Sequence, residues 1–297
     1  MMRALVIVGL VAAVLGLARF VVARRVERTD GRRARDADGI LIGAAGFTLD
    51  RAGAPGVLLL HGAGDTPQTL RELGEYLHAR GFAVSAPLLP GHGRSVRDFQ
   101  RVRYEDWRRT AADAYDALAA DRPWMGVVGL SMGGALAART VADRPDTSAL
   151  VLLAPYLELP GSLRLAAALS RVAELVSPYF GAEDPRSVRD AEAAARGLAY
   201  GVFTPAALRG LRQAALAGRE ALPRITASTL IIQSRQDNRV SAEVATRALA
   251  LLGTPDKRLE WVSEGGHVIT VDYGKAQVFA LTSNWLETHG AGSLLQS

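Results

Sequence analysis

Short, uninterrupted apolar runs alternate along this chain with longer segments whose apolar residues recur at helical spacing. The runs end in glycine or polar residues and include GVLLLHG at 56–62, VVGLS at 127–131 and STLIIQS at 228–234. Such runs are typical of buried parallel strands. The segments between them, such as 103–121, carry their apolar residues on one face, as amphipathic helices do. The alternation predicts an α/β fold: a mostly parallel central sheet with helices on both faces, joined by right-handed crossovers.

Further elements continue this alternation from Gly39 onward. Strands are expected at 39–50, as an opening strand or hairpin, and at 82–93, 148–155 and 257–262. Helices are expected at 66–81 and 274–289. Before the strand at 228–234, residues 158–222 are rich in Ala and Leu and lack strand signals. We expect this stretch to be a helical cap inserted over the strand ends, the alternative being further core helices of the same domain.

The N-terminal region has a different composition. Residues 4–18 are uninterrupted apolar, and after Arg19 the run resumes as far as Ala23. Counted through the arginine, the run reaches about twenty residues, enough to span a bilayer if the arginine reaches the interface. We expect a single uncleaved membrane anchor; the alternative is a signal peptide cut after Ala18 or Ala23, which would give a secreted protein. Residues 24–38 are polar and aperiodic, which indicates a linker.

The formal charge of +5 lies entirely in this region, because residues 1–36 hold eight arginines and three acidic residues. The remainder is neutral, which argues against nucleic-acid binding. The basic flank after the apolar run favours the cytoplasmic side, whereas Arg3 before it favours export, so the side stays open. The chain has no cysteine, which excludes disulfides, thiolate metal sites and a cysteine nucleophile. The expected organisation is a membrane segment and basic linker at 1–38, then one domain at 39–297.

Ser131 lies where a predicted strand turns into a small-residue helix, in the stretch VVGLSMGG. Gly129 and Gly133 flank it two positions away on either side and match G-x-S-x-G, the nucleophile elbow. Small flanking residues avoid clashes in so sharp a turn, which exposes the serine hydroxyl. The motif alone is weak, since a glycine-softened turn with an idle serine would fit it equally. The hypothesis therefore depends on an acid and a histidine later in the chain.

Asp237 and His267 lie just beyond the ends of two later predicted strands. The order Ser131, Asp237, His267 is that of α/β-hydrolases, and the carboxyl ends of parallel strands meet at one edge of a sheet. His267 would take the proton of the serine, while Asp237 would fix the ring tautomer and stabilise the imidazolium. Alternatively, Asp237 is a turn residue before Asn238, and Glu264 is a backup acid.

Two backbone N–H groups are candidates for an oxyanion hole. Met132 opens the predicted helix, where its N–H is free and the helix dipole favours an anion. Ala63 follows GVLLLHG and would supply the second donor, the alternative being a plain glycine turn. His61 and His92 precede the nucleophile, so we expect them to brace loops through hydrogen bonds.

Five motifs together resemble one family. HGAGDTPQTL, PLLPGHG, YEDW, VVGLSMGG and SEGGHVIT resemble the bacterial carboxylesterase and monoacylglycerol lipase group of the α/β-hydrolase superfamily. The resemblance covers about residues 55–135 and 228–289. It implies an α/β-hydrolase fold with a small helical cap, no metal and no cofactor. It also implies a catalytic triad of Ser131, Asp237 and His267 that hydrolyses short- to medium-chain esters or monoglycerides.

The chain departs from this group in three places: Ala63 stands where many members carry a bulky aromatic residue, the cap matches poorly, and the N-terminal hydrophobic segment is additional. Within the cap, Tyr179 and Phe180 are candidates for lining the substrate pocket. The combined expectation is a membrane-anchored serine esterase acting on small-molecule or lipid esters. Alternatives are a thioesterase, a peptidase, a C–C hydrolase or an acyltransferase with the same triad, or a non-catalytic membrane-tethered binding module. The sequence does not indicate an oligomeric state.

Overall fold

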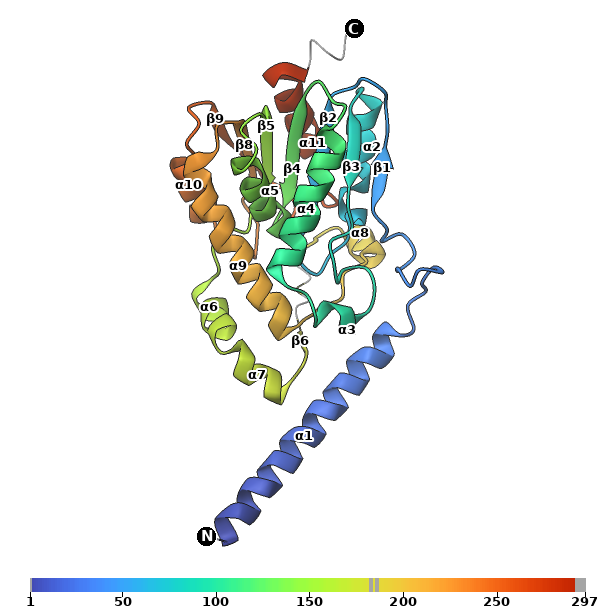
Figure 1. Ribbon diagram of the computed structural model, residues 1–297, viewed down its shortest axis with the longest axis vertical. Helices are drawn as coiled ribbons and strands as arrows, with labels where there is room; N and C mark the ends of the chain where they lie inside the picture. Colours follow the sequence, from blue (N-terminus) through green and yellow to red (C-terminus); the bar gives the residue numbers. More distant parts are fainter. Residues whose placement is uncertain (1, 182–183, 185–186, 292–297) are drawn as a thin grey trace.

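The computed structural model describes residues 2–181, 184 and 187–291. Its central sheet has the strand order β1-β3-β2-β4-β5-β8-β9 (Figure 1). The strands are β1 (Phe47–Leu49), β2 (Gly56–Leu60), β3 (Ala83–Ala86), β4 (Met125–Leu130), β5 (Ala149–Leu153), β8 (Ser228–Ser234) and β9 (Lys257–Val262). Only β1 is antiparallel to its neighbour in this sheet, which confirms the expected mostly parallel α/β-hydrolase architecture.

The apolar runs form strands because both of their faces are covered. In β5, Leu150 and Leu152 belong to one apolar cluster, Val151 and Leu153 belong to the other, and all four are fully buried. Burial of this kind removes apolar surface from water on both sides of the sheet and is its main source of stability.

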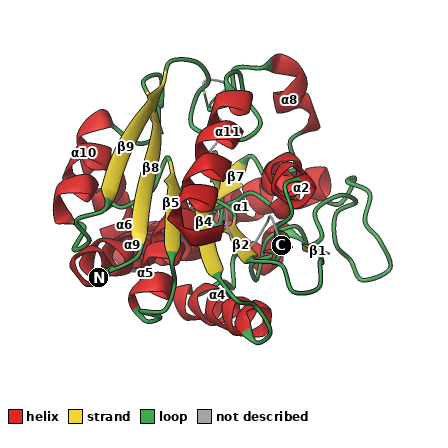
Figure 2. Ribbon diagram, turned by 90° about the horizontal axis from the view of Figure 1, so that it is seen from above, coloured by secondary structure: helices red, strands yellow, loops and turns green. Residues whose placement is uncertain are grey.

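The helices form a layer on each face of the sheet (Figure 2). One face is covered by α2 (Arg71–Ala79) and α11 (Lys275–Leu286). The other is covered by α4 (Tyr104–Ala119), α5 (Met132–Ala142), α9 (Pro205–Ala221) and α10 (Ala242–Leu251). Short connecting elements are η1 (Pro67–Leu70), α3 (Val96–Phe99), η2 (Leu222–Arg224) and η3 (Glu287–Ala291). Helices on both faces are the arrangement that the sequence predicts.

The stretch expected to be a purely helical cap differs from that expectation in two ways. It holds α6 (Gly161–Ala168), α7 (Ser170–Val176) and α8 (Ala191–Arg196), but also an antiparallel pair of two-residue strands, β6 (Phe180–Gly181) and β7 (Val202–Phe203). Strands this short leave no periodic signal in a sequence. In addition, α9 packs its buried face into the core cluster of the main sheet along its length, so it is a core helix.

The N-terminal region also departs from the expected division. Helix α1 (Met2–Asp30) continues through the first part of the expected linker, and it projects from the body near α3 and α7 (Figure 1). The chain then turns, forms an isolated antiparallel bridge between Arg35 and Leu41, and the expected opening strand is reduced to β1. Within the described ranges, no helix has both the length and the hydropathy needed to cross a membrane. The structure therefore does not support the expected membrane anchor.

Candidate active site

Ser131 occupies the sharp turn between β4 and α5. Its backbone has φ 56° and ψ −118°, outside the regions that non-glycine residues favour, which is typical of a functional position. A Cβ at Gly129 would overlap the carbonyl oxygen of Gly133, and a Cβ at Gly133 would overlap that of Leu60. Both flanking glycines are therefore required by the close approach of backbone segments, as the elbow motif predicts.

The structure brings the three expected triad side chains into one hydrogen-bonded chain. Nε2 of His267 lies 2.8 Å from Oγ of Ser131, and its Nδ1 lies 2.9 Å from Oδ2 of Asp237. Asp237 follows the carboxyl end of β8, and His267 follows that of β9. Ser131 is 9% exposed and His267 7%, so bulk water barely competes for these hydrogen bonds. The serine hydroxyl can donate to the imidazole, whose Nδ1–H can donate to the carboxylate.

The surroundings of Asp237 favour its ionised form. Burial by itself would raise the pKa of this carboxyl group, but the neighbouring His267 and the backbone N–H groups of Val240 and Arg239 together outweigh it, so the pKa is lowered. The backbone N–H groups of Arg239 and Val240 donate to Oδ1 at 2.7 and 2.9 Å, and the Gln233 side-chain amide donates to Oδ2 at 2.8 Å. These donors fix the carboxylate in the orientation that meets the imidazole, and the catalytic role of Asp237 stays a prediction.

Asp272 holds the loop that carries His267, and sequence reasoning did not identify it. Its carboxylate is 2% exposed and accepts four backbone hydrogen bonds of 2.7–2.9 Å, from Gly266, Tyr273, Arg189 and Asp190. The first donor directly precedes His267, and the last two belong to the cap region. An acid five positions after a histidine has no distinctive spacing, so the sequence offered no signal for this role.

A second contact joins the cap region to the same loop. The carbonyl oxygen of Ser187 accepts hydrogen bonds from the backbone N–H groups of His267 and Val268, at 2.9 and 3.0 Å. The side chain of Arg239 donates to Oγ of Ser187 at 2.9 Å. The histidine loop is therefore fixed from the cap side as well as from the sheet.

The two expected oxyanion donors lie on segments adjacent to Ser131. A Cβ at Gly62 would lie 3.3 Å from Cβ of Ser131, which places the loop containing the half-buried Ala63 next to the serine. Met132 is the first residue of α5, where backbone N–H groups have no partner within the helix. Both segments adjoin Ser131, and donation from the Ala63 and Met132 N–H groups to a substrate oxygen stays a prediction.

The two buried histidines that are not part of the hydrogen-bonded chain at Ser131, His61 and His92, brace the surrounding loops, as expected. His61 places Nδ1 2.9 Å from the carbonyl oxygen of Gly62, and its Nε2 accepts a hydrogen bond from the Leu89 N–H at 3.1 Å. Its ring centroid is 5.0 Å from that of His92. Burial lowers the pKa of His92 to about 4 and that of His61 well below its ordinary value, so both rings are neutral at pH 7.

The two aromatic residues expected to line a substrate pocket lie at the cap, in different surroundings. Tyr179 is 3% exposed and donates its hydroxyl to Glu27 of α1 at 3.3 Å. Phe180 is half-buried, with its ring centroid 6.5 Å from that of Phe203. Tyr179 therefore connects the cap to α1, while contact of either ring with substrate stays a prediction. In the described part of the chain, no group of three or more His, Asp or Glu side chains is arranged to hold a metal ion.

Curated proteins resemble this chain over most of their length. A thermostable monoacylglycerol lipase from Bacillus sp. (strain H-257) is 27% identical over 250 residues, covering 84% of this chain and 97% of the relative. A carboxylesterase from Bacillus subtilis (strain 168) is 28% identical over 228 residues, covering 76% and 89%.

Solved structures share the fold. A structure described as a metagenome-derived lipolytic enzyme superimposes with a TM-score of 0.77 at 26% identity, covering 84% of this chain and all of the other. The monoacylglycerol lipase of Paleococcus ferrophilus superimposes with a TM-score of 0.69 at 21% identity, covering 82% and 98%. The family model described as serine aminopeptidase, S33, matches residues 54–273, which include all three members of the hydrogen-bonded chain. The chain therefore belongs to the serine aminopeptidase (S33) family and is an α/β-hydrolase.

Proposed function

We propose that this protein is a serine hydrolase of carboxylic esters, with Ser131 as its nucleophile. The observation that carries the proposal is the continuous chain of hydrogen bonds from Ser131 through His267 to Asp237. A serine hydroxyl is a weak nucleophile by itself and needs a base oriented by a third group, and this chain has that arrangement.

In the proposed reaction, Oγ of Ser131 attacks the ester carbonyl carbon while Nε2 of His267 takes the hydroxyl proton. The negative charge that develops on the carbonyl oxygen is stabilised by the backbone N–H groups of Ala63 and Met132. The tetrahedral intermediate collapses, the C–O bond to the alcohol breaks, and His267 gives the proton to the leaving oxygen. Water then attacks the acyl carbon while His267 takes a proton from it, the bond between this carbon and Oγ of Ser131 breaks, and His267 returns the proton to Oγ, which releases the acid and restores Ser131.

The substrates that we propose are short- to medium-chain acyl esters or monoglycerides, and the names of the curated relatives support esters and monoglycerides as the substrate class. One is named a monoacylglycerol lipase and the other a carboxylesterase. The same triad could serve a thioesterase, a peptidase or an acyltransferase, and the family description names an aminopeptidase. Product analysis with competing alcohols, thioesters and aminoacyl amides would separate these reactions from ester hydrolysis.

The proposal is tested with p-nitrophenyl esters of increasing chain length and with monoglycerides. We expect Ser131→Ala to lower kcat by about 10⁴–10⁶-fold with the fold intact, because the covalent step is lost. Ser263→Ala removes the hydroxyl of an exposed serine near the histidine loop and should leave kcat unchanged. Equal rates in wild type and Ser131→Ala would refute the proposal, and failure of a fluorophosphonate probe to label Ser131 would favour a non-catalytic binding module.

A further inference from the structure

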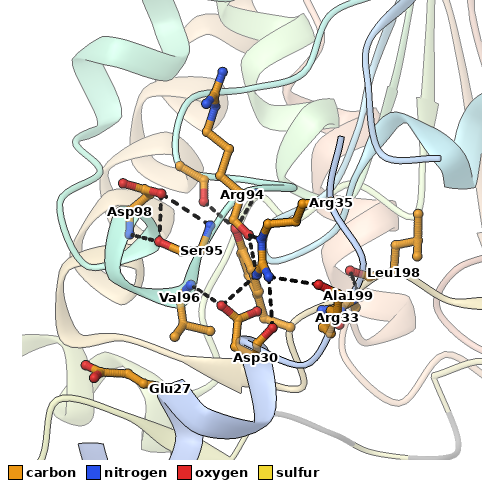
Figure 3. Close-up of polar contacts among 12 residues, drawn as sticks. Glu27, Asp30, Arg33, Arg35, Arg94, Ser95, Val96, Asp98, Leu198 and Ala199 are labelled. Carbon is orange, nitrogen blue, oxygen red and sulfur yellow. Dashed lines mark hydrogen bonds and ion pairs between the residues drawn. The ribbon is translucent and has the colours of Figure 1, made fainter. Parts of the chain in front are cut away.

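A cluster of polar contacts joins the end of α1 to the loop that precedes α3 (Figure 3). Asp30 is 7% exposed, and its Oδ2 accepts hydrogen bonds from Nη2 of Arg35 at 2.8 Å and from the Val96 N–H at 3.2 Å. The remaining donors of the Arg35 guanidinium go to the carbonyl oxygens of Asp30, Arg33 and Arg94, at 2.9–3.1 Å. A guanidinium that uses its donors on so many fixed acceptors holds the backbone around it in one arrangement.

The side chain of Arg33 extends from this cluster to the cap region. Its Nη2 donates to the carbonyl oxygen of Leu198 at 2.8 Å, and its Nη1 donates to that of Ala199 at 3.1 Å (Figure 3). The contacts of Arg35 fix the backbone at Asp30 and at Arg33 itself. The Arg33 side chain therefore joins this fixed backbone to the segment Leu198–Phe203. Neither Arg33 nor the rest of the α1 end lies within the part of the chain that the family model matches, residues 54–273.

The segment held by Arg33 in turn contacts the loop beside the proposed nucleophile. The backbone N–H of Tyr200 donates to the carbonyl oxygen of Gly64 at 3.2 Å, and Gly64 directly follows Ala63. A Cβ at Gly64 would lie 3.6 Å from the Phe203 ring, so this ring packs over the same loop. The Tyr200 hydroxyl donates to the Gly91 carbonyl at 2.8 Å and accepts from the Arg94 N–H at 3.0 Å. Both ends of the segment are therefore fixed against loops that surround the site.

We propose that Arg33 is a positioning residue for ester hydrolysis: by holding the Leu198–Phe203 segment, it keeps the Gly64 carbonyl and the adjacent Ala63 N–H in place. This inference rests on the proposed function. The geometric requirement on an oxyanion donor is strict, because its N–H must meet the oxygen as negative charge develops there. A loop that shifts by about 1 Å loses much of that interaction, even when the cause lies far from the reacting atoms.

The test compares Arg33→Ala, Arg33→Lys and Arg32→Ala in the full-length protein. Arg32 is an exposed neighbour and serves as the matched control. Rates are expressed per active site titrated with a fluorophosphonate, at a temperature well below the unfolding midpoint of every variant. We expect Arg33→Ala to lower kcat about 10–100-fold with little change in KM, because the lost interaction is made only in the transition state. Lysine offers a single point charge instead of a fork, so Arg33→Lys should restore activity only in part.

Hydrogen exchange measured on the same proteins gives an independent readout. Amides in residues 198–203, the Tyr200 N–H above all, should exchange faster in Arg33→Ala than in wild type and should be unchanged in Arg32→Ala. An Arg33→Ala variant with wild-type kcat, or with wild-type exchange in this segment, would overturn the proposal. If the wild-type protein hydrolyses no ester, the proposed function fails instead, and the exchange data still decide whether Arg33 holds the segment.

Discussion

The backbone N–H of Gly266 donates a hydrogen bond of 2.7 Å to the buried carboxylate of Asp272. Gly266 immediately precedes His267, so this bond fixes the start of the loop that presents the imidazole to Ser131. The same carboxylate accepts from two N–H groups of the cap region, at Arg189 and Asp190. One acidic side chain therefore aligns the proposed base and a cap segment together.

Replacing Asp272 should damage activity and stability together. In Asp272→Ala, four backbone N–H groups, of which that of Gly266 is buried, lose their acceptor, and we expect a loss of about 2–4 kcal/mol in the free energy of unfolding. We also expect kcat to fall about 10–100-fold because the imidazole loses its fixed position. Asp272→Asn keeps one acceptor oxygen and should fall between alanine and wild type. Urea unfolding and ester hydrolysis measure the two effects, and an alanine variant as active as wild type would contradict the role.

Replacing Asp237 by asparagine should disable the base while leaving the fold intact. The amide cannot orient the imidazole in the required tautomer or stabilise the imidazolium, so we expect kcat to fall by about 10⁴-fold. The matched control is Glu264→Gln, which removes the exposed acid that is the alternative partner of His267 and should leave kcat unchanged. The measurement is kcat for ester hydrolysis by both variants. A large loss of kcat in Glu264→Gln together with an unchanged kcat in Asp237→Asn would assign the acid to Glu264.

Asp65 should make stability depend on pH. Burial raises the pKa of this carboxyl group to about 6, from an ordinary value of 3.8. A carboxyl group with a raised pKa binds its proton more tightly in the folded state, so its contribution to stability is complete below pH 3.8 and is lost as the pH rises through about 6. At pH 8 the buried charge should cost about 2–3 kcal/mol.

Asp65→Asn removes this charge and keeps an oxygen that can accept from the Thr66 N–H, as the aspartate does at 2.8 Å. The variant should match wild type near pH 4 and exceed it by about 2–3 kcal/mol at pH 8. Urea unfolding of both proteins across this range gives the difference directly. A difference that does not change with pH would show that the carboxyl group titrates alike in the folded and unfolded chain.

The elbow should not tolerate a methyl group at Gly133. An added Cβ would overlap the Leu60 carbonyl oxygen at the end of β2, and neither backbone can move without disturbing the sheet. We expect Gly133→Ala to lower the free energy of unfolding by about 3 kcal/mol and to reduce activity further through displacement of Ser131. Gly161→Ala is the control, because its Cβ would meet nothing closer than 3.8 Å. Similar unfolding midpoints for the two variants would rule out the predicted overlap.

The features that the sequence predicts well follow from local patterns. Continuous apolar runs located the parallel strands, and polar residues directly after two strand ends pointed to Asp237 and His267. These patterns are informative because a strand buried on both faces tolerates only apolar residues, while its carboxyl end opens onto the site. The two glycines of the elbow, Gly129 and Gly133, could also be predicted from the sequence motif, because each is required by a close approach of backbone segments.

The features that it did not predict depend on contacts between distant, aperiodic segments. The carboxylate of Asp272 meets backbone groups more than eighty residues earlier in the chain, and Arg33 meets carbonyl groups at 198 and 199. Backbone acceptors and donors leave no trace in side-chain identity, so no motif marks such partners. The polar stretch after residue 23 was interpreted as linker for the same reason: its helix is held by contacts such as that of Glu27 with Arg97 and Tyr179.

Helix α9 begins beside the cap helices and ends deep in the layer that covers the sheet. A Cβ at Gly218 would lie 2.7 Å from the Ala135 carbonyl oxygen, so the end of α9 is in direct backbone contact with α5, the helix that starts at Ser131. The cap therefore cannot swing away as a single rigid body without pulling apart the scaffold of the nucleophile. We therefore expect any movement of the cap region to take place in α6, α7 and α8, while α9 stays in place against α5.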